Sequence, residues 1–342
     1  MNRKNFLGTT AALIGGVTIP FKKSFAEGEN EKIIYRKPAY LKAGDVVGIT
    51  APAGPITPEE IQPAIQVMKS WGYEIQVGDT IGKKDFNLGG TDDERLNDFQ
   101  KLLDDPKVKA IMCARGGYGS IRIVDRINWT KFRSKPKWII GFSDITVLHC
   151  HIHSNFHTAS IHSKMINSFP DNWNTAEPIQ IETIISIQDA LSGRKMKYSA
   201  ELNAQNKFGT AEGILVGGNL KTIETLSGTA SDIKTEGKIL FIEDTGEYLY
   251  SIDRMFWNLK RTGKLKNLKG LIIGGFKVKP DDPGEEFGKT VEEIVLEKIK
   301  NYKYPVCFNF PVGHQKNNFA LKCGVKHRLS VKENEATLIE MI

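Results

Sequence analysis

Short apolar runs alternate with amphipathic segments over the first half of the chain. Each run spans three to six residues and is bounded by polar or turn-forming residues, as buried strands are: Val46–Thr50, Glu74–Val77, Val108–Cys113 and Trp138–Ile140. Between them, Thr57–Glu60 and Thr91–Glu94 each place a glutamate three residues after a threonine, which is typical of a helix N-terminus. Alternating strands and helices predict a parallel sheet with helices on both faces.

The second half of the chain has a different pattern. Residues 163–212 are polar and rich in turn formers, apart from one predicted helix at Glu177–Leu191. Beyond them we predict strands at Gly213–Val216, Lys238–Ile242, Leu271–Ile273 and Val306–Phe308. Helices are predicted at Leu220–Leu226, Ile252–Lys260 and Val291–Tyr302, and a final hairpin at Arg328–Val331 with Ala336–Glu340. The chain therefore divides into an α/β domain over 40–165, a linker region over 166–210 and a mixed α/β domain over 211–342.

The first 26 residues resemble an export signal. Arg3 and Lys4 precede the apolar run Phe6–Ile19, and Ser24–Ala26 is similar to a small-residue cleavage site. The run is too short and too glycine-rich to span a membrane, and Asn2–Leu7 resembles a twin-arginine signal with lysine replacing the second arginine. We expect a periplasmic protein with no stable membrane insertion after cleavage. An uncleaved anchor, or a disordered tail on a cytoplasmic protein, is the alternative.

Composition narrows the class of function. The net charge is +7, but four cations and no acid lie in residues 1–26, which leaves +3 for the remainder. So small an excess argues against a nucleic-acid partner. The four cysteines show no C-x-x-C spacing and predict free buried thiols, although export would permit pairing; they are Cys113, Cys150, Cys307 and Cys323.

A serine stands where a predicted strand meets a predicted helix. Trp138–Ile140 is followed by Gly141 and Ser143, and apolar residues then recur at helical spacing from Ile145 to Phe156. A sharp turn lifts such a hydroxyl out of the sheet, and the N–H groups of the helix start favour the negative charge of a tetrahedral intermediate. The G-x-S-x-G form is absent because Ile145 replaces the last glycine. A serine that only caps the helix is the alternative.

The helix predicted over 145–157 is rich in histidine. His149, His153 and His157 recur every fourth residue and share one face, with His151 and Cys150 among them. Two histidines at this spacing can bind zinc, but neither H-E-x-x-H nor a third ligand is evident. We interpret them as a solvated or partly buried helix face and expect no metal.

A glycine-rich loop follows the strand Val108–Cys113. In Arg115–Gly119 the glycines permit positive φ and close approach of the backbone to a ligand. Neither G-x-G-x-x-G nor G-x-x-x-x-G-K-[ST] fits, so the indication of a nucleotide is weak. A structural turn and a set of backbone N–H groups aimed at an oxyanion remain the two other interpretations.

A serine nucleophile needs a base and a group that orients the base. Glu243 follows the predicted strand Lys238–Ile242, and His314 lies in a loop after a glycine. His162 is a rival base in the first domain. The order Ser143, Glu243, His314 is that of α/β-hydrolases, although here the acid and the base fall in the second domain. The site would then lie between the domains, where small ligands commonly bind.

These motifs together resemble the LD-carboxypeptidase family, which also holds the microcin C immunity peptidases. The segments that carry the resemblance, in order and spacing, are Arg115–Gly119, Ile140–Thr146, Gly218–Leu220, Leu240–Asp244 and Gly313-His314. The likeness covers about residues 40–330. It implies a Rossmann-like N-terminal domain with a nucleophile elbow, a mixed, barrel-like C-terminal domain, and a homodimer.

The resemblance also implies roles for single residues. Ser143 would be the nucleophile, His314 the base and Glu243 its orienting acid, with the amides of Gly117 and Asp144 as the oxyanion hole. It implies no metal or nucleotide cofactor. The expected substrate is the murein tetrapeptide, cut between the L-centre of a diamino acid and the terminal D-Ala. Beside the oxyanion loop, Arg115 is a candidate for binding the leaving carboxylate and Tyr118 for binding substrate.

The chain departs from the family pattern at one position: where members of the family often have His-Gly-Pro, it has His162-Ser163-Lys164. This predicts a different wall of the site. A rival substrate is an aminoacyl-nucleotide conjugate, on whose base Trp173 would stack. Two other classes stay open: an exported ligand-binding protein without catalysis, and an acyl-transfer enzyme that uses Cys113 or Cys150.

Overall fold

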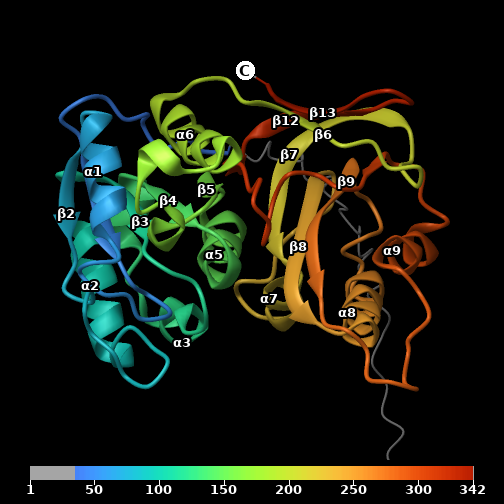
Figure 1. Cartoon of the computed structure of the whole chain (residues 1–342), viewed down its shortest axis with the longest axis horizontal. Coiled ribbons are helices and arrows are strands. Elements are labelled where there is room, and N and C mark those ends of the chain that lie inside the picture. The colour runs from blue at the N-terminus through green and yellow to red at the C-terminus, as the bar shows by residue number, and fades with distance from the viewer. Residues whose placement is uncertain (1–34, 342) are drawn as a thin grey trace, which may run out of the picture. The chain divides into compact units, whose positions relative to one another are not determined.

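The computed structural model describes residues 35–341, and the predicted export signal over 1–26 lies outside them. Two mixed sheets flanked by helices make up the described part, one built mainly from the first half of the chain and one from the second (Figure 1). The predicted fold class is therefore confirmed. Over residues 35–341, none of the helices has the length and apolar character needed to cross a membrane.

The first sheet has the strand order β11-β5-β4-β3-β1-β2. Its strands are β1 (Val46–Thr50), β2 (Glu74–Val77), β3 (Val108–Cys113), β4 (Trp138–Gly141), β5 (Ser160–His162) and β11 (Leu321–Cys323). β1 to β5 run parallel, whereas β11 pairs antiparallel with β5, with Leu321 opposite His162. A segment that the sequence assigned to the second domain thus completes the first sheet.

Helices cover both faces of the first sheet, because alternate strand residues point to opposite sides. Ala110 and Met112 of β3 face α1 and α6, whereas Ile111 and Cys113 face α2 and α5. The helices of this half are α1 (Gln62–Ser70), α2 (Asp92–Asp104), α3 (Ser120–Ile123), α4 (Thr130–Ser134), α5 (Thr146–Phe156) and α6 (Pro178–Ser192).

The two predicted capping boxes have different outcomes. At Thr91 both bonds form: its hydroxyl accepts from the Glu94 N–H (3.2 Å), and its N–H donates to the Glu94 carboxylate (2.9 Å). Thr57 and Glu60 exchange the same bonds around a turn, but helix α1 begins only at Gln62. Pro63 explains the shift, since a residue without an N–H fits the first turn of a helix and not its interior.

The predicted linker over 166–210 contains regular structure. α6 buries Ile184, Ile187 and Ala190 in the core beneath the first sheet. Where irregular chain was expected, β6 (Lys197–Ala200) pairs antiparallel with β13 at one edge of the second sheet. The polar sequence concealed this strand because half of its side chains face solvent.

The second sheet has the strand order β10-β9-β8-β7-β12-β13-β6. Its other elements are β7 (Gly209–Asn219), β8 (Ile239–Glu247), β9 (Gly270–Val278), β10 (Val306–Cys307), β12 (Lys326–Val331), β13 (Ala336–Glu340), α7 (Leu220–Thr225), α8 (Leu249–Arg261) and α9 (Val291–Ile299). β7 to β10 are parallel, and β12 with β13 forms the predicted hairpin. Lys207 and Val306 exchange two 3.0 Å backbone hydrogen bonds. The chain that follows the edge strand β6 is thereby bonded to β10, the strand at the other edge of the sheet.

Strand β8 runs past the point where the sequence predicted its end. It continues from Ile242 through Glu243 to Glu247, and its register with β9 shifts between Ile242 and Asp244. Such an irregularity re-aims a side chain within a strand. Glu243 therefore projects from within a strand and not from a strand end.

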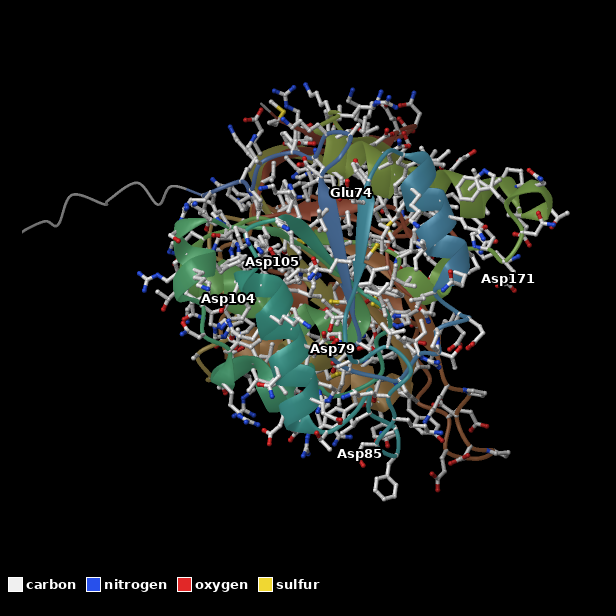
Figure 2. All side chains as sticks on the ribbon, turned by 90° about the vertical axis from the view of Figure 1, so that its left-hand side faces the viewer. Glu74, Asp79, Asp85, Asp104, Asp105 and Asp171 are labelled. Carbon is white, nitrogen blue, oxygen red and sulfur yellow. The ribbon has the colours of Figure 1, made fainter. Side chains whose placement is uncertain are left out.

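The β2 edge of the first sheet, which is opposite the β11 edge, is protected from pairing with other chains. β2 is a four-residue edge strand that carries the exposed Glu74, and Asp79, Asp104 and Asp105 lie on the same side of the molecule (Figure 2). Short, charged edge strands disfavour edge-to-edge association.

Candidate active site

The turn between β4 and α5 holds Ser143 in a left-handed backbone conformation, with φ +61°. This costs a non-glycine residue about 1–2 kcal/mol, and such strain commonly accompanies functional turns. Gly141 makes the turn possible, because a Cβ on it would lie 2.9 Å from Ile145. The hydroxyl thus stands at the carboxyl edge of the parallel strands, where sites form in such sheets.

Ser143, His314 and Glu243 form one hydrogen-bonded chain. The Ser143 Oγ lies 3.1 Å from His314 Nε2, and His314 Nδ1 lies 2.6 Å from Glu243 Oε2. The same carboxylate oxygen accepts from the His314 backbone N–H (3.2 Å). Glu243 is fully buried, whereas 18% of the His314 side chain is exposed. Three residues that are far apart in the sequence are therefore brought together as predicted.

The loop that carries His314 is held against Glu243 by a glycine. Gly313 has φ +103°, and a Cβ there would lie 2.4 Å from Glu243 Cβ. Its N–H donates to the buried Asn318 side chain (2.9 Å). On the other side, the Gly275 N–H donates to the Val312 carbonyl (2.9 Å). The imidazole is thus positioned by backbone contacts on both sides.

The second half of the chain docks directly onto the elbow. The Asn219 N–H donates to the Thr146 hydroxyl (3.1 Å), and a Cβ on Gly218 would lie 2.5 Å from the same oxygen. The Asn219 amide also donates to Asp244 (3.2 Å), whose pKa burial raises to about 6. The Gly218–Leu220 motif therefore serves as a contact between the strand end of β7 and the start of α5.

The glycine-rich loop lies against the nucleophile. A Cβ on Gly116 would be 3.3 Å from the Ser143 Oγ, and Gly117 has φ +101°. Within residues 35–341, the N–H groups of Gly117 and Asp144 donate to no protein acceptor. The Asp144 carboxylate accepts from the Ser120 N–H (2.8 Å), and burial raises its pKa. Asp144 thereby ties the elbow to the end of this loop.

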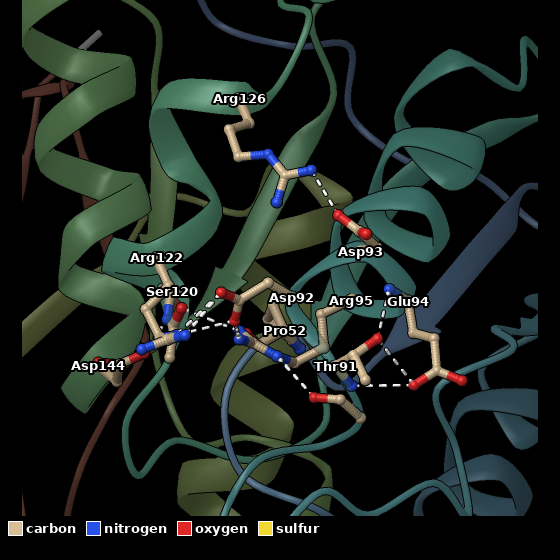
Figure 3. A network of polar contacts seen from close by, with 12 residues as sticks. Pro52, Thr91, Asp92, Asp93, Glu94, Arg95, Ser120, Arg122, Arg126 and Asp144 are labelled. Carbon is tan, nitrogen blue, oxygen red and sulfur yellow. Dashed lines mark hydrogen bonds and ion pairs between the residues drawn. The ribbon is translucent and has the colours of Figure 1, made fainter.

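A buried arginine anchors the same loop from the other side (Figure 3). Arg95 is fully buried and donates to the carbonyls of Pro52 (2.6 Å) and Gly119 (2.9 Å). Asp92 pairs with Arg95 and, at 2.8 Å, with Arg122. Arg95 was not predicted from the sequence, although its position on the apolar face of α2 was a usable signal.

Arg115 and Tyr118 are exposed on the outer side of the loop. They line an open cavity of about 520 Å³ together with Gly117, Lys84 and Phe86. The Arg115 guanidinium donates weakly to the Pro55 carbonyl (3.4 Å). Phe86 is 90% exposed, so an aromatic side chain borders the cavity that adjoins the glycine loop.

His162 does not take the position of the base. It is fully buried between Phe142 and Phe241, and neither ring nitrogen has a hydrogen-bond partner in the described chain. Burial brings the pKa of His162 well below its ordinary value. His314 is the histidine that is hydrogen-bonded to the Ser143 hydroxyl, and its ring packs on Phe142 with 4.8 Å between centroids.

The histidine face of α5, predicted to be solvated or partly buried, is buried more deeply than that. His149, His151 and His153 are buried, and only His157 is partly exposed. His149 bonds the Gly141 carbonyl (2.8 Å), and His151 bonds Ser231 (2.9 Å). The helix is covered on both sides because it lies between the first sheet and elements of the second half. Over residues 35–341, no three His, Cys, Asp or Glu side chains gather to hold a metal ion.

Buried histidines should make the protein labile to acid. Burial lowers the pKa of His149 and His327 to about 4 and that of His153 to about 3, whereas unfolded histidine titrates near ~6.5. As pH falls below about 6.5, the unfolded state binds protons first, so the free energy of unfolding decreases down to about pH 4. Urea unfolding at pH 7 and 5 should differ by roughly 2 kcal/mol per histidine.

Two buried carboxylates with raised pKa values, Asp144 and Asp244, act with the opposite sign. The raised pKa of Asp244 lets the folded state bind a proton before the unfolded state does. It therefore stabilises the fold as pH falls from about 6 towards the ordinary pKa of an aspartate. In His327→Gln the free energy of unfolding should fall less steeply with decreasing pH, with a slope that is smaller by about one bound proton. Equal stability at pH 7 and pH 5 would contradict the assignment of neutral, buried histidines.

The four cysteines are free and buried. Burial raises the pKa of the Cys113 and Cys150 thiols. A thiol is a poor nucleophile when its thiolate is disfavoured. The structure therefore argues against the cysteine alternative for acyl transfer.

Comparison with known proteins agrees with this geometry. Residues 47–163 match the LD-carboxypeptidase N-terminal domain, and residues 212–329 match the LD-carboxypeptidase C-terminal domain. The chain is 34% identical to the probable murein peptide carboxypeptidase of Bacillus subtilis, over 88% of this chain and 94% of that protein.

Two further relatives span nearly the whole described chain. The muramoyltetrapeptide carboxypeptidase of Oxalobacter formigenes superposes with a TM-score of 0.77 and 26% identity, over 87% of this chain and 99% of the other. The microcin C7 self-immunity protein of Escherichia coli is 26% identical over 88% of this chain and 95% of its own. With both domain matches in order along one chain, the protein belongs to the LD-carboxypeptidase family.

Proposed function

We propose that the protein is a serine-type LD-carboxypeptidase that removes the C-terminal D-Ala from murein tetrapeptides. The observation that carries the proposal is the chain of hydrogen bonds from Ser143 through His314 to Glu243, at 3.1 and 2.6 Å. A serine hydroxyl bonded to an imidazole that is itself bonded to a buried carboxylate is the arrangement of serine hydrolases.

In the first step His314 Nε2 accepts the proton of the Ser143 hydroxyl as Oγ attacks the scissile carbonyl carbon. Glu243 accepts a hydrogen bond from Nδ1–H, which keeps Nε2 free to act as the base and stabilises the imidazolium that forms. The N–H groups of Gly117 and Asp144 stabilise the oxyanion, because they have no protein acceptor in the described chain.

In the second step the imidazolium returns its proton to the leaving nitrogen, and the C–N bond breaks to release the terminal amino acid. A water molecule then attacks the acyl–Ser143 ester with His314 as base, and the shortened peptide leaves with a free carboxylate. Arg115 and Tyr118 bind the substrate, since they line the cavity beside the glycine loop.

The test is hydrolysis of L-Ala-γ-D-Glu-meso-diaminopimelate-D-Ala, followed by mass spectrometry. We expect release of D-Ala and accumulation of the tripeptide, with no cleavage of the epimer that ends in L-Ala. Binding of the tetrapeptide without turnover would instead indicate a ligand-binding protein and contradict the proposal.

A second candidate is hydrolysis of an aminoacyl-nucleotide conjugate, favoured by the microcin relative. Trp173, half-buried in the turn Trp173–Thr175 ahead of α6, is the side chain proposed to stack on the base. Turnover of such a conjugate with no release of D-Ala would select this candidate and leave the catalytic residues unchanged.

A further inference from the structure

The ammonium of one buried lysine bonds to no other group in the part of the chain that the structure describes. Among residues 35–341 five lysines are buried, and four of them bond to carboxylates or carbonyls: Lys137, Lys264, Lys298 and Lys322. The fifth, Lys164, is 8% exposed, and its ammonium makes no hydrogen bond or ion pair with the described chain. Its Nζ still contacts solvent, since it is absent from the fully enclosed polar atoms. A largely buried cation that only solvent reaches is poorly compensated, and an anionic ligand that enters from solvent would supply its counter-charge.

Lys164 stands at the catalytic edge of the first sheet. Gly141 of β4 pairs with His162 of β5, and Ser143 and Lys164 each follow two residues beyond that pair. Adjacent strands are about 4.8 Å apart, so the two residues start from neighbouring positions. The next residue, Met165, would touch a Cβ on Gly116 at 3.2 Å. Three successive strand ends therefore supply the glycine loop, the nucleophile and this lysine.

Within residues 35–341, Glu177 is the acid that acts on the Lys164 ammonium. Burial lowers the pKa of Lys164, and Glu177 at the start of α6 opposes that decrease. Glu177 is already bonded to Lys316, at 2.7 and 2.9 Å. Lys316 follows His314 by two residues in the loop after β10. The carboxylate that acts on Lys164 is therefore already engaged by a lysine of the His314 loop.

We infer that Lys164 binds the free carboxylate of the substrate's terminal residue. The inference rests on the proposed function, because a carboxypeptidase must distinguish a chain end from an internal peptide. The terminal carboxylate lies one residue, about 3.8 Å of Cα spacing, beyond the scissile bond. A lysine rooted one strand from the nucleophile reaches that distance. Arg115 is a weaker match, since it is exposed and already donates to a carbonyl.

The test compares each enzyme on two substrates, the tetrapeptide acid and the same peptide ending in D-alaninamide. For the wild type, amidation should lower kcat/KM by about 10- to 100-fold, the effect of losing a hydrogen bond to a charged group. Lys164→Met should lower kcat/KM for the acid by a similar factor and should no longer distinguish acid from amide. Lys164→Arg should restore part of the preference. Lys69→Met, which removes an exposed lysine in the last turn of α1, should keep the full preference.

Peptide binding to Ser143→Ala, measured by calorimetry, tests the inference without turnover. Preference for the acid should be present in Ser143→Ala and lost in Ser143→Ala/Lys164→Met, with melting temperatures showing that both are folded. If the preference persists without Lys164, or disappears in Arg115→Met instead, the inference is wrong. Absence of D-Ala release by the wild type would overturn the proposed function, while the binding comparison would still decide the role of Lys164.

Discussion

Ser143→Ala and His314→Ala should each lower kcat by about 10³-fold or more, without loss of the fold. The physical reason is that Oγ forms the covalent intermediate and Nε2, 3.1 Å away, takes its proton. Glu243→Gln should cost less than either, because the carboxylate orients and stabilises the imidazole without reacting. Steady-state release of D-Ala measures all three, and circular dichroism with thermal melting checks the fold.

The effects of substituting Ser143 and His314 should not add. Residues that act as a unit lose nearly all their effect with the first substitution, so Ser143→Ala/His314→Ala should be about as inactive as either single variant. His162→Gln serves as the comparison, since His162 is a histidine of the same region without a bond to the nucleophile. Loss of turnover in His162→Gln together with retained turnover in His314→Ala would show that the base is misassigned.

Gly313→Ala should abolish most activity and destabilise the fold by roughly 2–4 kcal/mol, the combined effect of a positive φ and an overpacked site. The new methyl group would lie 2.4 Å from Glu243 Cβ, so either the loop or the strand must move. A displacement of about 1 Å is enough to lose 10²-fold in rate. Urea unfolding and release of D-Ala measure the two effects.

Gly263→Ala is the matched control for Gly313→Ala. Gly263 also has a positive φ, +79°, but a Cβ there meets nothing within 4 Å. It should lose only about 1 kcal/mol of stability and no activity. Equal behaviour of the two variants would mean that the contact with Glu243 is unimportant and that backbone strain alone matters.

Local patterns determined the elements next to the site. β3 was predictable at Val108–Cys113 because a run of apolar residues between polar ones is a local signal. The capping box at Thr91 likewise marked the start of α2, since its bonds join residues three apart. Ser143 and His314 stood out because each lies in a turn after an apolar run. Their roles, however, came from the resemblance to a family.

Several features depended on partners distant in the sequence. β11 joins the first sheet because it pairs with β5, about 160 residues earlier in the chain. The sequence did not show how deeply the histidines of α5 are buried, because their spacing defines a face but not what covers it. Elements of the second half cover it. Glu243 was expected at a strand end, whereas the shifted register between β8 and β9 directs it from within the strand.

The sequence by itself determined the class of fold, most strands and helices, and the residue types for acyl transfer, because these follow from periodicity, capping and motif order. Only the tertiary structure decided which side chains meet. His314 rather than His162 bonds Ser143, Arg95 holds the glycine loop, and the Lys164 ammonium at the catalytic edge bonds to none of residues 35–341. Burial and the absence of a partner are properties of packing between segments that lie far apart in the sequence, so no local pattern encodes them.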